Sequence, residues 1–446
     1  MAARMTPNFV PPHLRRSLAT VSMLGAATAI GAFMAFLTQT LLARELGPAD
    51  YGLFASSLVT VTMIAPLAGF GLTQFRLKVY GVEGWAAHRW LKPSMHFTVF
   101  TTLLAIGLVV GWALTGAPPN DTRFSLLVLT PVIICTLATD LVGNKLRLEE
   151  RYQFMALWQL MIPASRLAVA TMLLLVPQLT NRFVAVGYGA IALLVTLRAL
   201  PQLRTMVRDQ MELKGHGRRD LAAAGPVVNP ELTQLWSQAW AYGVVAILYP
   251  VFFQISTVLL KYLNDDTQAG LYGIALSVMT AVYLIPVVIY QKFLLAKLHR
   301  WAAHDKPKFW MVYRKGNLSM LALGLVIAVA MVAVTPWVVP IVFGDQFRPV
   351  VKILMVLAPC VPIRFLSVAM GSVLLTEDHM RYRVYAMGLA AGAVIGLNLV
   401  LIPRFHALGA ASATVAGELV LLLVTYYCVR RFVKPGQAVL PIVTPN

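Results

Sequence analysis

Charged side chains are scarce in this chain of 446 residues. Only 12% of the residues are Asp, Glu, Lys or Arg and 59% are hydrophobic, whereas a soluble domain has about 25% charged residues. An ordinary soluble globular protein is therefore excluded. Apolar runs long enough to cross about 30 Å of hydrocarbon recur along the whole sequence. Because these runs do not alternate apolar and polar residues as barrel strands do, we predict an all-α polytopic membrane protein.

Cysteine and histidine are also sparse. Cys135, Cys360 and Cys428 all fall within apolar runs, which predicts small buried side chains and no disulfide framework. The eight histidines show no spacing typical of metal ligands. We therefore expect neither a metal ion nor another cofactor.

Motifs of enzymatic chemistry are absent. The sequence contains no G-x-x-x-x-G-K-[ST] phosphate loop and no G-x-S-x-G nucleophile turn. The loops predicted to face outside are also too short to build an external active site. We predict that the protein is not an enzyme.

Basic residues outnumber acidic ones, with 37 Lys and Arg against 18 Asp and Glu, a net charge of +19. No basic and aromatic binding module accompanies this charge, so we expect no nucleic-acid partner. With twelve spans assigned, the two termini and every second loop hold 28 of the Lys and Arg residues, and the alternate loops hold seven. The positive-inside rule then places both termini in the cytoplasm. The spans are predicted at 21–43, 52–75, 95–114, 124–143, 155–176, 183–200, 238–260, 270–292, 317–341, 350–373, 384–402 and 408–429.

The segment 201–237 divides these spans into two sets of six. Its mixed charge, its Gly and Pro residues and its lack of apolar periodicity are typical of a cytoplasmic linker. We predict an N-terminal lobe at 21–200 and a C-terminal lobe at 238–430, with cytoplasmic tails at 1–20 (basic) and 431–446. Both lobes begin and end inside, so they are parallel repeats, an arrangement that in transporters places the substrate site between the halves.

A sequence repeat relates the two halves. Residues 41–79 align with residues 259–299 when Tyr51 is set over Tyr272. A single basic residue at a span end is most simply explained by snorkelling. A positive charge at matching positions of both halves also fits a cleft that binds an anionic headgroup, because Arg can form forked hydrogen bonds to pyrophosphate. The matched basic residues are Arg76 with Lys297 and, after four extra link residues, Arg44 with Lys261.

Four ionisable residues of the predicted spans are candidates for function, because a charged side chain at membrane depth is costly. Arg166, near the middle of its span, should face a polar cavity and bind an anion, or pair with Asp140. Arg364 follows a proline pair and is the second candidate for an anionic headgroup. Asp140 could couple transport to an ion or form a cap pair with Lys145. Glu418 could likewise couple transport, or hydrogen-bond to a neighbouring helix.

Two segments resemble a known family. Residues 43–48, Ala-Arg-Glu-Leu-Gly-Pro, followed by Tyr51-Gly52, resemble the first link of polysaccharide-biosynthesis flippases in the multidrug/oligosaccharidyl-lipid/polysaccharide exporter superfamily. Residues 398–411, with N-L-x-L-I-P and A-L-G-A-A, together with Glu418, resemble the closing segment of that family. The resemblance implies two six-helix lobes around a central, often cationic cavity that works by alternating access.

The resemblance also implies a cargo. This would be an undecaprenyl-pyrophosphate-linked oligosaccharide, moved across the bacterial inner membrane for surface or exported polysaccharide. The expected partners are this lipid-linked oligosaccharide and the bilayer, and could include other polysaccharide-assembly membrane proteins. Drug exporters share the fold, so a cation-coupled multidrug antiporter stays an alternative, although the two bases within spans disfavour a cationic drug site. An integral-membrane polymerase or ligase is disfavoured by the short outer loops.

Overall fold

The computed structural model describes residues 12–116, 119–176, 178–208, 210–214, 229–289, 306–372 and 380–433. These residues form α-helices and short helical turns, with no β-strand among them. Nine of the helices are long and apolar enough to cross a membrane, or ten when the bent pair Pro349–Leu357 and Cys360–Gly371 counts as one span. The prediction of an all-α polytopic membrane protein is confirmed.

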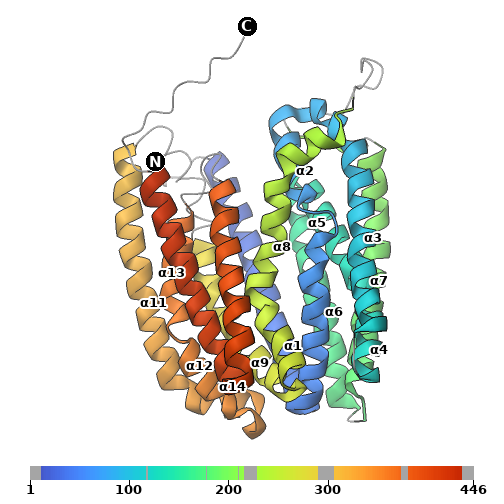
Figure 1. Cartoon of the computed structure of the whole chain (residues 1–446). Coiled ribbons are helices and arrows are strands. Elements are labelled where there is room, and N and C mark those ends of the chain that lie inside the picture. Colours follow the sequence, from blue (N-terminus) through green and yellow to red (C-terminus); the bar gives the residue numbers. More distant parts are fainter. Residues whose placement is uncertain are drawn as a thin grey trace, which may run out of the picture.

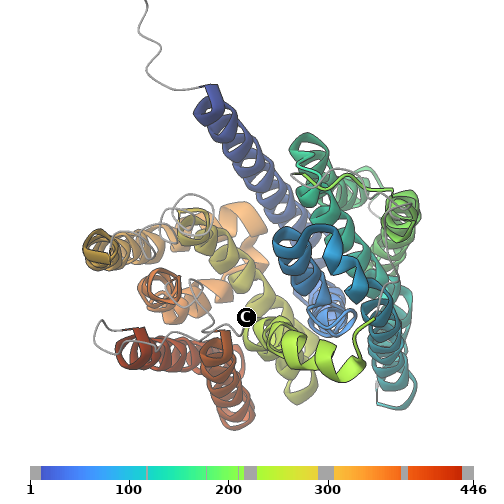
Figure 2. The same ribbon diagram turned by 90° about the horizontal axis from the view of Figure 1, so that it is seen from above.

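The helices run side by side along one axis (Figure 1). Helices α2 to α7 gather on one side of the molecule and α11 to α14 on the other, with α1, α8 and α9 between them (Figures 1 and 2). The N-terminal half consists of α1 (Pro12–Ile64), η1 (Ala65–Leu67), α2 (Leu72–Glu83), η2 (Gly84–Trp90), α3 (Leu91–Thr115), α4 (Asn120–Leu129), α5 (Pro131–Leu148), α6 (Tyr152–Leu175) and α7 (Asn181–Val207). The C-terminal half consists of α8 (Leu232–Leu263), α9 (Asp266–Val287), α11 (Lys306–Phe343), η4 (Asp345–Phe347), α12 (Pro349–Leu357), α13 (Cys360–Gly371), α14 (Met380–Cys428) and η6 (Val429–Val433).

Helices α1 and α14 each reverse direction at one non-helical residue. Gly47 has φ +75° and His406 has φ +52°. The Tyr51 hydroxyl donates to Gln39 Oε1 at 2.7 Å, whereas twelve residues of straight helix would separate them by about 18 Å. If the two arms of α1 and the two arms of α14 are each counted as a span, the total agrees with the twelve predicted spans. The number twelve stays a prediction, because hydropathy and length identify nine or ten spanning helices.

The two ends of the bundle differ in what they carry. One end, which we call the hairpin end, holds the reversals at Gly47 and His406 and the link between α8 and α9. The opposite end, which we call the linker end, holds α2, η2, the end of α7 and the start of α8 (Figure 1). The positive-inside rule predicts that the hairpin end faces outside and the linker end faces the cytoplasm.

Several predicted boundaries shift in the structure. The span predicted at 52–75 ends at Ile64, because Gly69, Phe70 and Gly71 all have positive φ and the chain restarts as α2. Helix α1 already begins at Pro12, inside the segment predicted as a tail, and α7 continues past the predicted lobe boundary at residue 200. Local backbone breaks and helix extensions of this kind leave little trace in hydropathy.

At the hairpin end, α1 and α9 cross at two glycines. A Cβ on Gly52 would lie only 1.7 Å from the carbonyl oxygen of Asp266, and a Cβ on Gly270 would lie 2.2 Å from that of Pro48. Only glycine permits so close an approach of two backbones. The two segments that the sequence repeat relates therefore contact each other directly at this end.

Helix α8 contacts the N-terminal half along most of its length. Because these contacts reach from the linker end to the hairpin end, the two halves are joined along α8. In order, the contacts are a ring stack of Phe70 on Trp236 with centroids 5.3 Å apart, a hydrogen bond from the Thr62 hydroxyl to Gln254 Oε1 (3.4 Å), and one from Trp112 Nε1 to the Tyr262 hydroxyl (2.8 Å).

Candidate functional site

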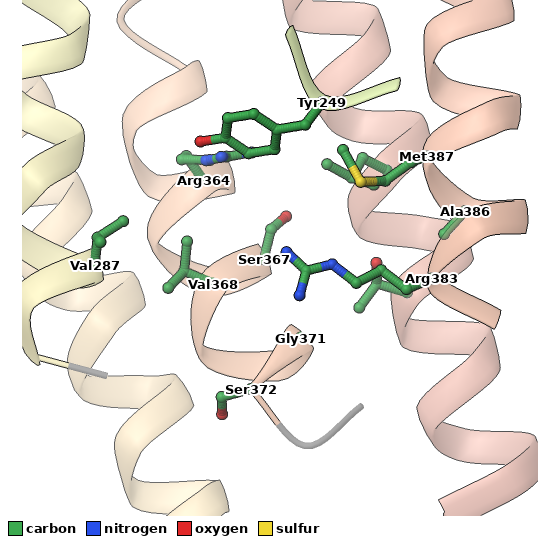
Figure 3. Close-up of a pocket in the computed structure, with 12 residues that line it drawn as sticks. Tyr249, Val287, Arg364, Ser367, Val368, Gly371, Ser372, Arg383, Ala386 and Met387 are labelled. Carbon is green, nitrogen blue, oxygen red and sulfur yellow. The ribbon is translucent and has the colours of Figure 1, made fainter. Parts of the chain in front are cut away.

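A cavity of about 90 Å³ lies between α8, α9, α13 and α14, all in the C-terminal half. Figure 3 shows Arg364 from α13 and Arg383 from α14 on either side of Ser367, with Tyr249 of α8 beside Arg364. None of the described residues that line the cavity is acidic. The cavity is therefore cationic. Its polar lining residues are Tyr249, Arg364, Ser367, Ser372, Arg383 and Thr425.

Helical spacing explains why these side chains meet. Arg364, Ser367 and Gly371 stand at intervals of three and four residues, so they share one face of α13. Arg383 and Met387 are related in the same way on α14. Since α13 ends at Gly371 and α14 begins at Met380, the cavity lies toward the linker end.

Arg364 and Glu418 form a buried ion pair beside this cavity. Arg364 Nη1 lies 3.6 Å from Glu418 Oε1, and the two side chains are 9% and 1% exposed. The guanidinium also lies over the rings of Phe253 (4.3 Å) and Tyr283 (5.7 Å). The sequence identified both charged residues but did not indicate that they pair with each other.

The hydrogen-bonding capacity of this pair is incompletely used. A separation of 3.6 Å is too long for a normal hydrogen bond, and within the described residues Arg364 Nε and both carboxylate oxygens of Glu418 have no hydrogen-bond partner. Burying two charges is costly unless further hydrogen bonds satisfy them. The pair can therefore accept an additional polar group, such as a ligand in the adjacent cavity.

Arg383 was missed as a site residue. It stands just before the apolar run of its helix, so its charge was attributed to a cytoplasmic loop. In the part of the chain that the structure describes, it makes no hydrogen bond and no ion pair, and it faces the cavity (Figure 3). An unpaired guanidinium that lines a cavity is a ready binding group for an anion.

Arg166 occupies a different place, in the N-terminal half. Its guanidinium lies 4.7 Å from the ring centroid of Tyr188 on α7. Neither of the pairs considered for Asp140 forms in the described residues, because Asp140 is exposed and makes no ion pair there. Lys145 pairs with Glu149 instead (3.1 Å) and donates to Gln202 (2.7 Å). Arg166 thus keeps a cation–ring contact without a counter-charge among these residues.

The matched basic residues are not brought together. Arg76 near the linker end is 5% exposed and its Nε donates to the Ser94 hydroxyl at 2.9 Å, so it does not snorkel. Lys261 at the hairpin end pairs with Asp266 at 2.6 Å, and Arg44 is exposed at that end. Lys297 lies outside the described residues. Among the predicted headgroup residues that the structure describes, Arg364 alone lines the cavity.

The fold is that of transporters in the multidrug/oligosaccharidyl-lipid/polysaccharide exporter superfamily. The chain is similar to the solved lipid II flippase MurJ in an inward closed conformation, with a TM-score of 0.68 and 12% identity over 91% of this chain and 87% of that one. It is also similar to an inward-facing multidrug resistance MATE transporter (TM-score 0.65, 10% identity, 90% and 94% covered). A superfamily transporter from Pyrococcus furiosus, described as having a binding pocket of reverse polarity, gives a TM-score of 0.57 at 12% identity, with 92% and 94% covered.

The family follows from the sequence itself. Residues 17–294, more than half of the chain, match the profile of the family described as polysaccharide biosynthesis protein, and the chain belongs to that family. A search among curated proteins returned no match. The protein is therefore a multi-pass membrane protein of the polysaccharide-biosynthesis family, the family that the sequence resemblance predicted, and it has the fold of MurJ and MATE transporters.

Proposed function

We propose that this protein moves an undecaprenyl-pyrophosphate-linked oligosaccharide from the cytoplasmic to the outer leaflet of a bacterial inner membrane by alternating access. The observation that carries the proposal is the cavity with Arg364 and Arg383 and no acidic residue among its described lining residues, in a chain of the polysaccharide-biosynthesis family. A pyrophosphate is doubly charged and planar guanidinium groups bind such oxyanions through forked hydrogen bonds. The similarity to a lipid II flippase supports a lipid-linked cargo.

The two arginines would bind the headgroup in different ways. Arg383 has no partner among the described residues and can bind an oxyanion directly. Arg364 would share its guanidinium between Glu418 and the headgroup, because their 3.6 Å separation leaves its Nε unused. A headgroup that draws Arg364 away would leave Glu418 buried without its counter-charge, which makes Glu418 the stronger of the two coupling candidates. Asp140, exposed and unpaired in the described part of the chain, is the weaker one.

The position of the cavity fits entry from the cytoplasmic leaflet. It lies toward the linker end, which the distribution of Lys and Arg places in the cytoplasm. A cation-coupled drug antiporter is the second candidate. It would need carboxylates that face its substrate, whereas Glu418, the carboxylate beside this cavity in the described residues, is paired with Arg364.

Replacing Arg383 tests the proposed function. In proteoliposomes loaded with a fluorescent lipid-pyrophosphate-linked oligosaccharide, Arg383→Gln should slow flipping by about tenfold or more, since a hydrogen bond to a charged group contributes roughly 1.5–3 kcal/mol. Arg381→Gln is the matched control, because Arg381 is exposed, only two residues away and outside the cavity. Equal activity of the two variants would contradict the assignment of the headgroup site.

A deletion strain separates flipping from polymerisation. With the polymerase gene intact, loss of this protein should leave lipid-linked repeat units on the cytoplasmic face of the membrane. If single repeat units appear instead on the outer face, the protein acts after flipping, and a polymerase or ligase becomes the better description.

A further inference from the structure

A second hollow lies on the surface of the N-terminal half, between α5, α6 and α7, apart from the cavity described above. It is a groove of about 380 Å³. Its walls divide into a polar part formed by Arg151, Arg198 and Gln202 and an apolar part that includes Leu157, Trp158 and Met161. No acidic residue is among the described residues that line it. This division resembles the chemistry of a lipid, with a charged head and an apolar chain.

The polar part presents hydrogen-bond donors that are not fully used. Arg198 is exposed and makes no hydrogen bond, ion pair or ring contact in the described residues. Arg151 lies over the ring of Phe154 at 4.4 Å, and its Nη1 lies 3.8 Å from Glu149 Oε2, too far for a normal hydrogen bond. Gln202 accepts a hydrogen bond from a buried lysine through Oε1, which leaves its amide nitrogen to donate into the groove. An anion fits these three groups.

The apolar part opens onto the surface that meets the bilayer. Leu157 is 67% exposed, and Leu194 and Leu197 beside the groove on α7 are 62% and 59% exposed. Large apolar side chains exposed together in this way are typical of a surface that lipid covers. Met161 lies one turn beyond Leu157 on α6 and extends the same wall away from the linker end.

The groove lies at the depth along the helices that corresponds to a membrane interface. Arg151 directly precedes the first residue of α6, and Arg198 lies in the C-terminal half of α7. Arg and Trp side chains at helix ends mark the depth at which lipid phosphates lie. Basic pockets between membrane helices are a recurrent form of site for anionic lipid headgroups.

We propose that this groove binds an anionic glycerophospholipid of the surrounding leaflet, with its phosphate between Arg151 and Arg198 and one acyl chain along Leu157 and Met161. The apolar wall is continuous with the cationic part, so a lipid fits better than a soluble phosphate. The site is separate from the transport cavity, and it stands whether or not the proposed cargo is correct.

Lipid binding can be counted directly by native mass spectrometry. The full-length protein in mild detergent is titrated with phosphatidylglycerol or with phosphatidylcholine of the same acyl chains. We expect the wild type to retain phosphatidylglycerol preferentially. Arg151→Gln combined with Arg198→Gln should weaken phosphatidylglycerol binding by about tenfold or more, because two charge-assisted contacts are lost, and should leave phosphatidylcholine binding unchanged.

A control and a second variant keep the test decisive. Arg208→Gln removes an exposed charge at the end of the same helix but outside the groove, and it should bind phosphatidylglycerol as the wild type does. Leu157→Asn keeps both arginines, is tolerated at an exposed position, and should also weaken binding. Equal retention of the two lipids by the wild type, an equal loss in Arg208→Gln, or unchanged binding in both groove variants would overturn the proposal.

Discussion

A single added methyl group at Gly52 tests whether the hairpin end must close during transport. In the structure, a Cβ at this position would lie 1.7 Å from the carbonyl oxygen of Asp266 and 2.8 Å from the backbone nitrogen of Gly270. Ordinary van der Waals contact begins at 3.4 Å. Helices α1 and α9 would therefore have to move apart by roughly 1.7 Å along the line from this Cβ to the Asp266 carbonyl oxygen. Both neighbours are backbone atoms, and no side-chain rotation can relieve the clash.

The expected effect is a shift between arrangements of the two halves. Overpacking costs about 1–3 kcal/mol, and in Gly52→Ala this cost falls on the closed hairpin end and is absent when the halves separate there. A cost of this size changes the population of the closed arrangement by about 5- to 150-fold. If every transport cycle passes through that arrangement, flipping should slow by a similar factor while the helices stay folded.

Cysteine cross-linking measures closure of this end directly. In a background without the three native cysteines, Arg44→Cys with Gln346→Cys places a pair across the two halves, where Gln346 Nε2 now lies 3.4 Å from the Arg44 carbonyl oxygen. We expect slower cross-linking when Gly52→Ala is added. Gly111→Ala is the control, because no atom lies within 4 Å of its added Cβ. Wild-type cross-linking together with wild-type flipping in Gly52→Ala would refute the reasoning.

Three further sets of substitutions test charged residues within the helix bundle. Glu418→Gln leaves Arg364 buried without a counter-charge and should destabilise the protein by about 3–5 kcal/mol, which a lower Tm in detergent would show. The double variant Arg364→Met with Glu418→Leu should recover stability but not flipping. Recovery of both would exclude the pair from the mechanism. Arg166→Ala should lower the amount of surface polysaccharide at equal membrane expression. Arg166→Lys should retain only part of the activity, because the flat contact of the guanidinium with the ring is lost. Full activity of the Ala variant would remove Arg166 from the mechanism. Asp266→Asn leaves the buried Lys261 ammonium without its carboxylate and should lower stability by about 1–3 kcal/mol, so an unchanged Tm would show that the pair contributes little.

Features with a local cause were predictable from the sequence. Low charge and long apolar runs predicted the all-α membrane fold. The gap between the spans predicted at 21–43 and 52–75 predicted the first reversal, and Gly47 within that gap accepts the φ of +75° found there. The short motifs near both ends of the chain predicted the family, which the match over residues 17–294 shows.

Features that depend on helix packing were not predictable in the same way. Arg364 and Glu418 are distant in sequence, and nothing in the local pattern indicates which helices bring them together. Arg383 looked like a loop charge because hydropathy does not show that α14 begins before it. The crossing of Gly52 with Gly270 depends on the approach of two helices from different halves. Such pairings are set by three-dimensional contacts between elements, which hydrophobic periodicity does not encode.

The continuous contact of α8 with the N-terminal half has a consequence for the path of a lipid tail. Two bodies joined along one helix can rotate about it, but they cannot part on that side. If the headgroup crosses through the protein while its polyprenyl tail stays in the bilayer, the tail must pass on the side away from α8. On that side the first turns of α1 stand between the two groups of helices (Figure 2), so α1 is the element that would have to move to let the tail through.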